Sequence, residues 1–283
     1  MTAQKSKNSK NGLSKKVSGS SVLLIGAGRM GTALLNGWVA NKVRNITVVE
    51  PNQTTSLKKF AKKYHFNLAT NISDLSKNIK FETVVVAIKP QVLKAEAAEL
   101  KDVAHNATVI SIAAGTSIKS LKGAWGKGAR IVRAMPNTPG SIGRGITGLY
   151  AAKGVRPVDI NRADKLLSAL GETVWVKNED LIDSVTAISG SGPAYIFHMV
   201  EALTTSGMSQ GLPRLKAEQL ARATVMGAGR LLESNRKSAK SLREEVTSPG
   251  GTTEAALKKL TRGMTPLMER TVTAAKKRAK QLS

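Results

Sequence analysis

Residues 21–37 read SVLLIGAGRMGTALLNG, a short apolar run that ends in three spaced glycines and continues into a periodic apolar stretch. The order of strand, glycine turn and helix is typical of the first βαβ unit of a dinucleotide-binding domain. In that unit Gly26 permits the tight turn, Gly28 lets the backbone approach a pyrophosphate, and Gly31 lets the helix pack closely. The helix N-terminus presents N–H groups and partial positive charge to the phosphates. A glycine turn needed only for packing is the alternative, and the agreement of strand, turn and helix favours dinucleotide binding.

An acid follows at the end of the second expected strand. Glu50 lies about 20 residues beyond Gly31, where such domains place an acid on the adenosine ribose. A solvent-facing acid at a strand end is the alternative interpretation. We predict that Glu50 contacts the ribose.

Apolar runs rich in β-branched residues recur over the first 180 residues and alternate with helical patterns. Continuous runs of this kind predict a parallel sheet covered on both faces. Their alternation with helices predicts βαβ units. We expect strands at 22–25, 46–49, 83–88, 108–112, 130–133, 148–151 and 173–176, and helices at 32–41, 56–64 and 159–170.

Strand patterns are absent from the sequence after about residue 180, and helical patterns separated by glycine and proline replace them. The fold class predicted is therefore α/β, with a doubly wound Rossmann-type domain over 21–180 and an all-helical dimerisation and substrate domain over 181–283. The helical domain carries small and apolar residues in excess of what a thin solvated layer requires. We expect its helices at 194–206, 214–233, 241–246, 252–260 and 266–281.

The first 20 residues form a basic tail that contains five lysines and no acid. Such a composition predicts disorder, and we expect the tail to be dispensable for catalysis. It lacks the apolar core of a secretory signal and the arginine pattern of a transit peptide. No apolar run approaches the roughly 18 residues of a membrane span. With no cysteine in the chain, we expect a cytoplasmic protein without disulfides.

The formal net charge of +25 is extreme for 283 residues. Nucleic-acid or anionic-membrane binding is one interpretation, and a basic solvated surface is the other. The basic residues are spread along the whole chain, and neither a zinc finger nor an RNA-stacking motif accompanies them. We therefore expect no specific nucleic acid as a partner. Three scattered histidines also give no reason to expect a metal site.

Six segments together resemble the pyrroline-5-carboxylate reductases, in order and across both expected domains. The combination of MPNTP and SPGGTT is specific to that family. The resemblance extends over about residues 21–260. The segments are GAGRMGTALLNG (26–37), VVVAIKPQVL (84–93), VISIAAGTSI (109–118), RAMPNTPGSIGRGITGLYA (133–151), ISGSGPAYIF (188–197) and SPGGTTEAAL (248–257).

The resemblance implies a reaction as well as a fold. It implies hydride transfer from NADPH, with NADH also accepted, to the C=N carbon of 1-pyrroline-5-carboxylate, which gives L-proline. It further implies a homodimer in which the cofactor of one subunit meets helical elements of the other, with assembly into a ring of dimers left open.

Residue roles follow from the resemblance position by position. Glu179 matches an acid on the substrate side. Gly251 belongs to the same loop as Thr252 and Thr253, which match the pair that holds the substrate carboxylate and ring nitrogen, so Thr253 is the candidate catalytic residue. The implied cofactor-binding residues are Gly26, Ala27, Gly28, Arg29, Met30, Gly31, Glu50, Asn71, Ile88, Lys89, Pro90 and Ala114.

The SPGGTT segment also has a physical interpretation of its own. Pro249 and two glycines precede Thr252 and Thr253, which begin a helix whose N–H groups can bind a carboxylate. An ordinary capped helix start is the alternative. For SGSGPAY, the alternative to a site is a helix kink where two subunits pack, and its small residues favour close helix contact.

Two positions depart from the family pattern. Glu50 replaces a Ser or Thr that is frequent near the adenosine 2′ position, and Glu245 replaces an Asn that touches the cofactor in some members. Both place a carboxylate beside expected phosphate, which puts the NADPH preference in question. No His, Cys or Tyr stands out as proton donor to the imine, so no general acid is assigned.

Two other functions are compatible with parts of the sequence. A β-hydroxyacid dehydrogenase shares the two-domain plan, but the turn at 189–195 lacks the catalytic lysine that such enzymes use. A nucleic-acid-binding protein with a vestigial dinucleotide domain has only the net charge to support it.

Overall fold

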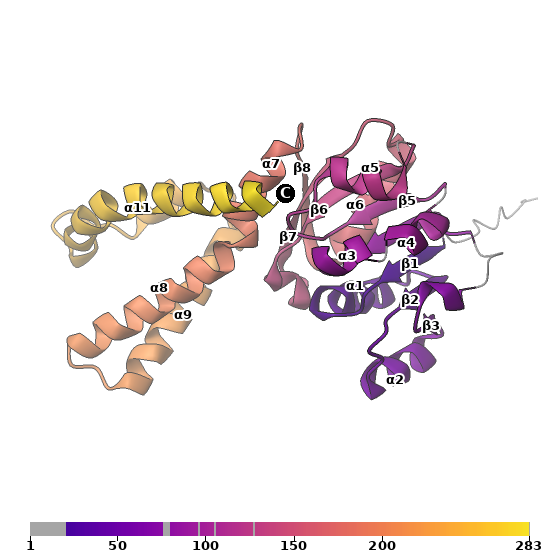
Figure 1. The fold of residues 1–283 in the computed structure, drawn as a ribbon. Coiled ribbons are helices and arrows are strands. Elements are labelled where there is room, and N and C mark those ends of the chain that lie inside the picture. Colours follow the sequence, from indigo (N-terminus) through magenta and orange to yellow (C-terminus); the bar gives the residue numbers. More distant parts are fainter. Residues whose placement is uncertain (1–20, 76–79, 96, 105, 127, 283) are drawn as a thin grey trace, which may run out of the picture.

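The computed structural model describes residues 21–282 apart from 76–79, 96, 105 and 127. The basic tail at 1–20 lies outside the described residues. The described chain forms a sheet layered between helices, from which a set of long helices extends to one side (Figure 1).

The described strands form one eight-stranded sheet in the order β3-β2-β1-β4-β5-β6-β7-β8. The chain moves outward from β1 in both directions, which is the doubly wound arrangement expected from the sequence. The strands are β1 (Val22–Ile25), β2 (Ile46–Val49), β3 (Asn67–Ala69), β4 (Thr83–Val86), β5 (Thr108–Ser111), β6 (Arg130–Met135), β7 (Gly145–Ala151) and β8 (Gly171–Trp175).

The first six strands in sequence are mutually parallel, but β7 pairs with β6 in the antiparallel direction and β8 runs parallel to β7. The connection from β6 to β7 explains the reversal. It consists of a few residues around the 3₁₀ helix η2 (Thr138–Ile142), whereas a parallel crossover needs a dozen residues or more.

Alternating residues of the central strands enter two hydrophobic cores, one on each face of the sheet. In β1, Val22 and Leu24 contact one core, and Leu23 and Ile25 contact the other. The first core is covered by α1 (Arg29–Ala40), α2 (Thr55–Tyr64) and α6 (Pro157–Leu167), and the second by α3 (Pro90–Ala95), α4 (Ala97–Ala104) and α5 (Ile118–Trp125). Two further 3₁₀ turns are η1 (Ile72–Asp74) and η3 (Ser168–Leu170).

Beyond residue 179 the described chain is helical. The elements are α7 (Asp180–Val185), the π-helix η4 (Thr186–Gly190), α8 (Gly192–Ser209), α9 (Arg214–Ser234), α10 (Ala239–Glu245) and α11 (Thr252–Leu282). The predicted break between helices at 252–260 and 266–281 was wrong, since α11 continues through Pro266. In Figure 1, α8 and α9 lie side by side, and both this pair and α11 extend away from the sheet.

The far end of α11 returns to the sheet, beside α7 and η4 (Figure 1). Among the described residues, no helix has the length and apolar character needed to cross a membrane.

Candidate active site

The glycine loop leaves β1 at the carboxyl edge of the sheet, and close packing requires two of its glycines. Gly26 has a φ of 93°, and a Cβ there would lie 2.7 Å from Ile88 Cγ2 and 2.8 Å from the Ala87 carbonyl oxygen. A Cβ on Gly31 would overlap the Gly26 carbonyl oxygen. Only glycine therefore lets α1 begin this close to the turn.

Gly28 has an open environment, which tests whether the loop fits a phosphate. The residue is exposed, and a Cβ there would meet nothing within 4 Å. Packing among the described residues therefore gives no reason for glycine here. No described side chain caps the N-terminus of α1, and its first turn contains no acid. An open helix N-terminus of positive polarity fits the pyrophosphate of a dinucleotide.

Glu50 lies beside this loop and not on open surface. The residue is half-buried at the end of β2. One carboxylate oxygen accepts the Ala27 N–H at 2.7 Å, and the other accepts the Asn52 N–H at 2.9 Å. These two hydrogen bonds hold the negative charge at the junction of the glycine loop and β2, where dinucleotide-binding domains place the adenosine ribose.

The other predicted cofactor residues lie at the same edge of the sheet. Parallel β1, β4 and β5 end level with one another: the Ala87 N–H donates to Ile25 O at 2.8 Å, and the Ile112 N–H donates to Val86 O at 3.0 Å. Adjacent loops therefore carry the glycine turn, Ile88 to Pro90, and Ala114, while Asn71 follows β3 at the outer end. Arg29, Asn71, Lys89 and Ala114 are exposed, and Ala27, Met30, Ile88 and Pro90 are half-buried.

Glu179 occupies a different setting, just before α7. Its carboxylate accepts the Ile118 N–H at 2.6 Å and pairs with Arg133 at 3.0 Å. Arg133 in turn pairs with Asp183 at 3.2 Å and has only 5% of its side chain exposed. The predicted role of Glu179 on the substrate side stays a prediction, because its carboxylate faces protein groups.

Sequence reasoning missed this network, although it contains a signal. Arg133 interrupts the apolar run RIVRAM of β6, and an arginine in a buried strand requires acidic partners. The sequence alone does not show which acidic residues lie beside Arg133 in the folded chain.

The threonine pair lies at the start of α11. Gly250 has a φ of 72°, and its N–H donates to the Glu254 carboxylate at 2.7 Å. This hydrogen bond, with a further contribution from Lys258, holds the pKa of Glu254 below its usual value. Gly251, Thr252 and Thr253 thus belong to a tight turn in which the Gly250 N–H donates to Glu254 and the Gly251 N–H donates to the Ser248 carbonyl oxygen.

The cofactor edge and the threonine pair are not brought together within one chain. Leu282, at the other end of α11, lies against Gly115 in the loop after β5. A helix of 31 residues rises roughly 45 Å. Thr252 and Thr253 are therefore at the distant end of α11 from the cofactor edge (Figure 1).

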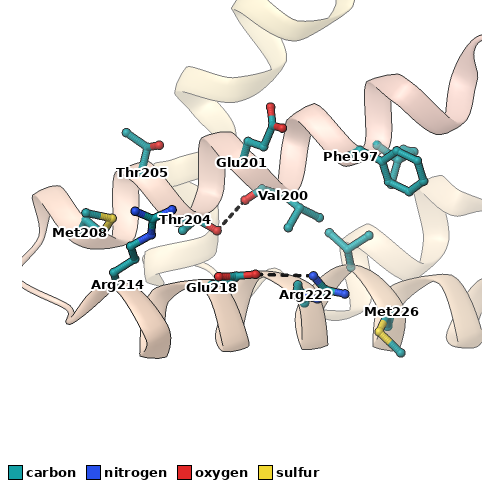
Figure 2. A pocket seen from close by; sticks show the side chains of 12 residues that line it. Phe197, Val200, Glu201, Thr204, Thr205, Met208, Arg214, Glu218, Arg222 and Met226 are labelled. Atoms are coloured by element: carbon teal, nitrogen blue, oxygen red, sulfur yellow. Dashed lines mark hydrogen bonds and ion pairs between the residues drawn. The ribbon is translucent and has the colours of Figure 1, made fainter.

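A groove of about 900 Å³ lies between α8 and α9 and has no predicted site residue in its lining. Figure 2 shows Phe197, Met208 and Met226 among its apolar side chains, with Glu218 and Arg222 paired at 3.5 Å along α9. Several of these apolar residues are strongly exposed, including Phe197 at 63% and Met226 at 59%.

Two family models match the chain. One, described as pyrroline-5-carboxylate reductase dimerisation, matches residues 179–282, and the other, described as NADP oxidoreductase, coenzyme F420-dependent, matches residues 21–115. The pyrroline-5-carboxylate reductase of Pseudomonas aeruginosa is 36% identical over 266 residues, which cover 93% of this chain and 96% of that protein. This chain belongs to the pyrroline-5-carboxylate reductase family.

Other pyrroline-5-carboxylate reductases support the assignment. The Synechocystis protein is 37% identical over 263 residues, 92% of this chain and 97% of that one. A solved pyrroline-5-carboxylate reductase from Coxiella burnetii is 39% identical, with a TM-score of 0.87 over 94% of this chain and 99% of that chain. The pyrroline carboxylate reductase of Plasmodium falciparum, solved with NADP bound, is 26% identical, with a TM-score of 0.77 over 93% and 98% of the two chains.

Proposed function

We propose that this protein reduces 1-pyrroline-5-carboxylate to L-proline with a nicotinamide dinucleotide as hydride donor, the last step of proline biosynthesis. The single observation that carries the proposal is identity of 36% to a pyrroline-5-carboxylate reductase over 93% of the chain. The open glycine loop at the carboxyl edge of the sheet supports the dinucleotide part, because its geometry fits a pyrophosphate.

The cofactor residues would share the work of binding. The glycine loop and the N-terminus of α1 hold the pyrophosphate, and Glu50 accepts from the adenosine ribose. Ile88 and Ala114, in the loops after β4 and β5, line the channel toward the nicotinamide. When bound, the dinucleotide supplies the hydride. Holding the dinucleotide and the imine side by side turns a bimolecular reaction into a reaction within one complex, so most of the catalysis comes from positioning.

The substrate would lie against the start of α11. Beside Gly251, whose own N–H donates to the Ser248 carbonyl oxygen at 3.0 Å, Thr252 and Thr253 offer N–H and hydroxyl groups to the substrate carboxylate, and the Thr253 hydroxyl faces the ring nitrogen. The imine takes up a hydride at carbon and a proton at nitrogen. The Thr253 hydroxyl can hydrogen-bond that nitrogen but is a poor acid, so the imine binds already protonated or takes its proton from water beside Thr253.

A second copy of the chain would complete the site. The cofactor edge and the threonine pair lie at opposite ends of α11, so one chain cannot bring both into contact with the same substrate molecule. We propose a homodimer in which the threonine pair of one subunit reaches the cofactor edge of the other, with a ring of dimers as a further assembly.

The test is a spectrophotometric assay of NADH and NADPH oxidation by the purified full chain. We expect oxidation with 1-pyrroline-5-carboxylate and formation of proline, no turnover of a panel of 3-hydroxy acids with the oxidised cofactors, and no discrete DNA complex in a gel shift. Turnover of a hydroxy acid without turnover of the imine would overturn the proposal, and so would a specific DNA complex from an inactive protein.

A further inference from the structure

The loop between β5 and α5 lies in the middle of the cofactor edge. It begins at Ile112, whose N–H is bonded to β4, and ends at Ser117, the N-cap of α5. Ala114 is exposed, whereas Ala113 and Thr116 on either side are buried. The conformation of this short loop therefore decides where Ala114 stands relative to a bound dinucleotide.

The first contact that holds the loop comes from Glu179. Its carboxylate accepts the N–H of Ile118, the first residue of α5, at 2.6 Å. A charge-assisted hydrogen bond at a helix N-terminus is among the stronger kinds. The start of α5, and with it the end of the loop, is thus tied to the residue that precedes α7.

An ion pair with a buried arginine fixes Glu179, whose own side chain is 27% exposed. The same carboxylate oxygen that accepts from Ile118 also accepts from Arg133 at 3.0 Å, and Arg133 reaches Asp183 of α7 at 3.2 Å. The side chains of Arg133 and Asp183 are 5% and 10% exposed. Because both ends of the guanidinium are used, Glu179 has little freedom to turn toward a ligand.

The second contact comes from the last described turn of α11. Gly115, in the centre of the loop, has a φ of 67°. A Cβ there would lie 2.8 Å from the Leu282 carbonyl oxygen and 2.9 Å from Leu282 Cβ. The loop and the end of α11 are therefore in direct contact, and α11 also packs on α7.

We propose that Glu179 is a positioning residue for the dinucleotide site, and that Glu179 and Leu282 together fix the loop after β5 to the C-terminal helices. The dinucleotide part of the proposed function is what this inference rests on. It predicts that the helical region acts on cofactor affinity through the loop, without touching the cofactor.

The inference separates two possible roles of Glu179. A substrate-binding carboxylate, when removed, raises the KM for the imine. A carboxylate that holds the start of α5 instead raises the Kd for the dinucleotide, which can be measured without any imine present.

The experiment compares NADH binding by the full chain, its Glu179→Ala and Glu179→Gln variants, and an Arg133→Lys variant. We expect Kd to rise at least about tenfold in Glu179→Ala, because a charged hydrogen bond is lost, and less in Glu179→Gln, whose amide oxygen still accepts from Ile118. Arg133→Lys cannot bridge both acids and should be intermediate. Glu172→Ala, an exposed carboxylate on neighbouring β8, should leave Kd unchanged.

Hydrogen exchange gives a second readout that does not require the cofactor. We expect the Ile118 amide to exchange faster in Glu179→Ala than in the wild type. An unchanged Kd in Glu179→Ala, or a rise only in the KM for 1-pyrroline-5-carboxylate, would overturn the inference. If the wild type binds NADH but does not reduce the imine, the proposed reaction fails while the Kd series still decides the role of Glu179.

The Leu282 contact has a matched pair of variants. Gly115 and Gly143 have nearly equal φ angles, 67° and 69°, but a Cβ on Gly143 would meet nothing within 4 Å. Both alanine variants bear the left-handed backbone cost, and only Gly115→Ala displaces α11. We expect Kd for NADH to rise at least about fivefold in Gly115→Ala alone. Equal effects in the two variants would show that the contact with α11 has no part in cofactor binding.

Discussion

Glu50 combines two properties that bear on cofactor choice. Its carboxylate is held in place by the Ala27 and Asn52 N–H groups, so its negative charge stays beside the glycine loop, where dinucleotide-binding domains place the adenosine ribose. NADPH carries a 2′-phosphate there, and NADH carries a free hydroxyl that a carboxylate can accept from. At about 5 Å and an effective dielectric constant near 20, like unit charges repel by about 3 kcal/mol before salt screening. Lys58 and Lys59 on α2 are exposed and offset part of this.

We therefore expect NADH to be used well and any NADPH preference to be small. Glu50→Ser should shift the ratio of the two kcat/KM values toward NADPH by at least about tenfold. Glu50→Gln is the control for charge, because it retains an acceptor for the Ala27 N–H. It should shift the ratio in the same direction. If neither variant changes the ratio, Glu50 supports the loop and does not read the ribose.

Thr253→Ala addresses the substrate half of the site. Loss of one hydrogen bond to a charged group costs about 1.5–3 kcal/mol, so kcat/KM for the imine should fall roughly 10- to 150-fold. The Kd for NADH should stay unchanged, because the Thr253 hydroxyl is proposed to contact the substrate ring and not the nucleotide. Thr261→Ala, a hydroxyl bonded to the Leu257 carbonyl further along α11, is the control. A loss of cofactor affinity in Thr253→Ala would contradict the placement.

Asp159 concerns stability and not the site. Its side chain is fully buried at the other edge of the sheet and pairs with Arg156 at 2.8 Å, Arg130 at 3.2 Å and Arg162 at 3.5 Å. The hydrogen bond from Arg156 in particular holds the pKa of Asp159 far below its usual value. A folded-state pKa that is depressed stabilises the fold above the unfolded pKa of about 3.9 and loses that effect as pH falls below it.

Asp159→Asn should therefore lower the free energy of unfolding at pH 7 by roughly 3 kcal/mol. It should also flatten the fall in stability between about pH 4 and lower values, since the titrating group is gone. Denaturant unfolding over that pH range measures both effects, and Glu172→Gln on the surface of β8 should change neither. A variant as stable as the wild type would mean that the three arginines find other partners.

At the scale of elements, the sequence predicted the inner sheet well, because β1, β2, β4 and β5 are short runs rich in β-branched and other apolar residues that are buried throughout. It missed β3, whose three residues NLA carry no β-branched side chain. The direction of β7 could not be predicted from the pattern of apolar residues either. Strand composition does not determine strand direction, and only the length of the connection between two strands bears on it. The cofactor loops were predictable for the same reason as the inner strands, since they follow them directly.

The continuity of α11 shows a different limit. Proline lacks an N–H and its ring crowds the carbonyl four residues earlier, which here belongs to Arg262, so a helix boundary near Pro266 was the expectation. The lost hydrogen bond and the ring clash together cost about 3 kcal/mol, and they do not break a helix whose remaining turns are intact on both sides. The sequence pattern alone does not show whether the helix continues through the proline or ends before it.

Pro266→Ala should restore the missing hydrogen bond and raise stability by about 1–3 kcal/mol. The check is thermal unfolding at one fixed protein concentration, because oligomers unfold at temperatures that depend on concentration. Pro157→Ala is the control, since Pro157 is the first residue of α6, where proline is favourable, and no gain is expected. A lower Tm for Pro266→Ala would show that packing requires the proline at this position.

At the scale of the whole molecule, the described chain has a surface that one copy does not cover. None of the residues of α8 is buried, and large apolar side chains on α8, α9 and α11 are more than two-fifths exposed. They include Phe197 at 63%, Leu220 at 55%, Leu231 at 55% and Leu267 at 56%. A monomeric protein rarely exposes so continuous an apolar surface. The sequence predicted this surface from its small and apolar residues, but it did not show that the threonine pair lies roughly 40 Å from its own cofactor edge.

The dimer prediction follows from these two facts together. Obligate interfaces of this kind bury more than about 2,000 Å², and in the proposed dimer α11 of one copy reaches the sheet of the other. Light scattering should therefore give a mass of at least two chains of 30.0 kDa at all concentrations where the protein is active. Mixing two impaired variants offers a sharper test: Thr253→Ala and a Gly28→Trp variant that blocks the glycine loop. If each site draws these residues from different chains, refolding the two together should recover up to about a quarter of wild-type activity, because one site in half of the dimers is intact. Either a stable, active monomer or no recovery in a mixed dimer would contradict a site shared between two chains.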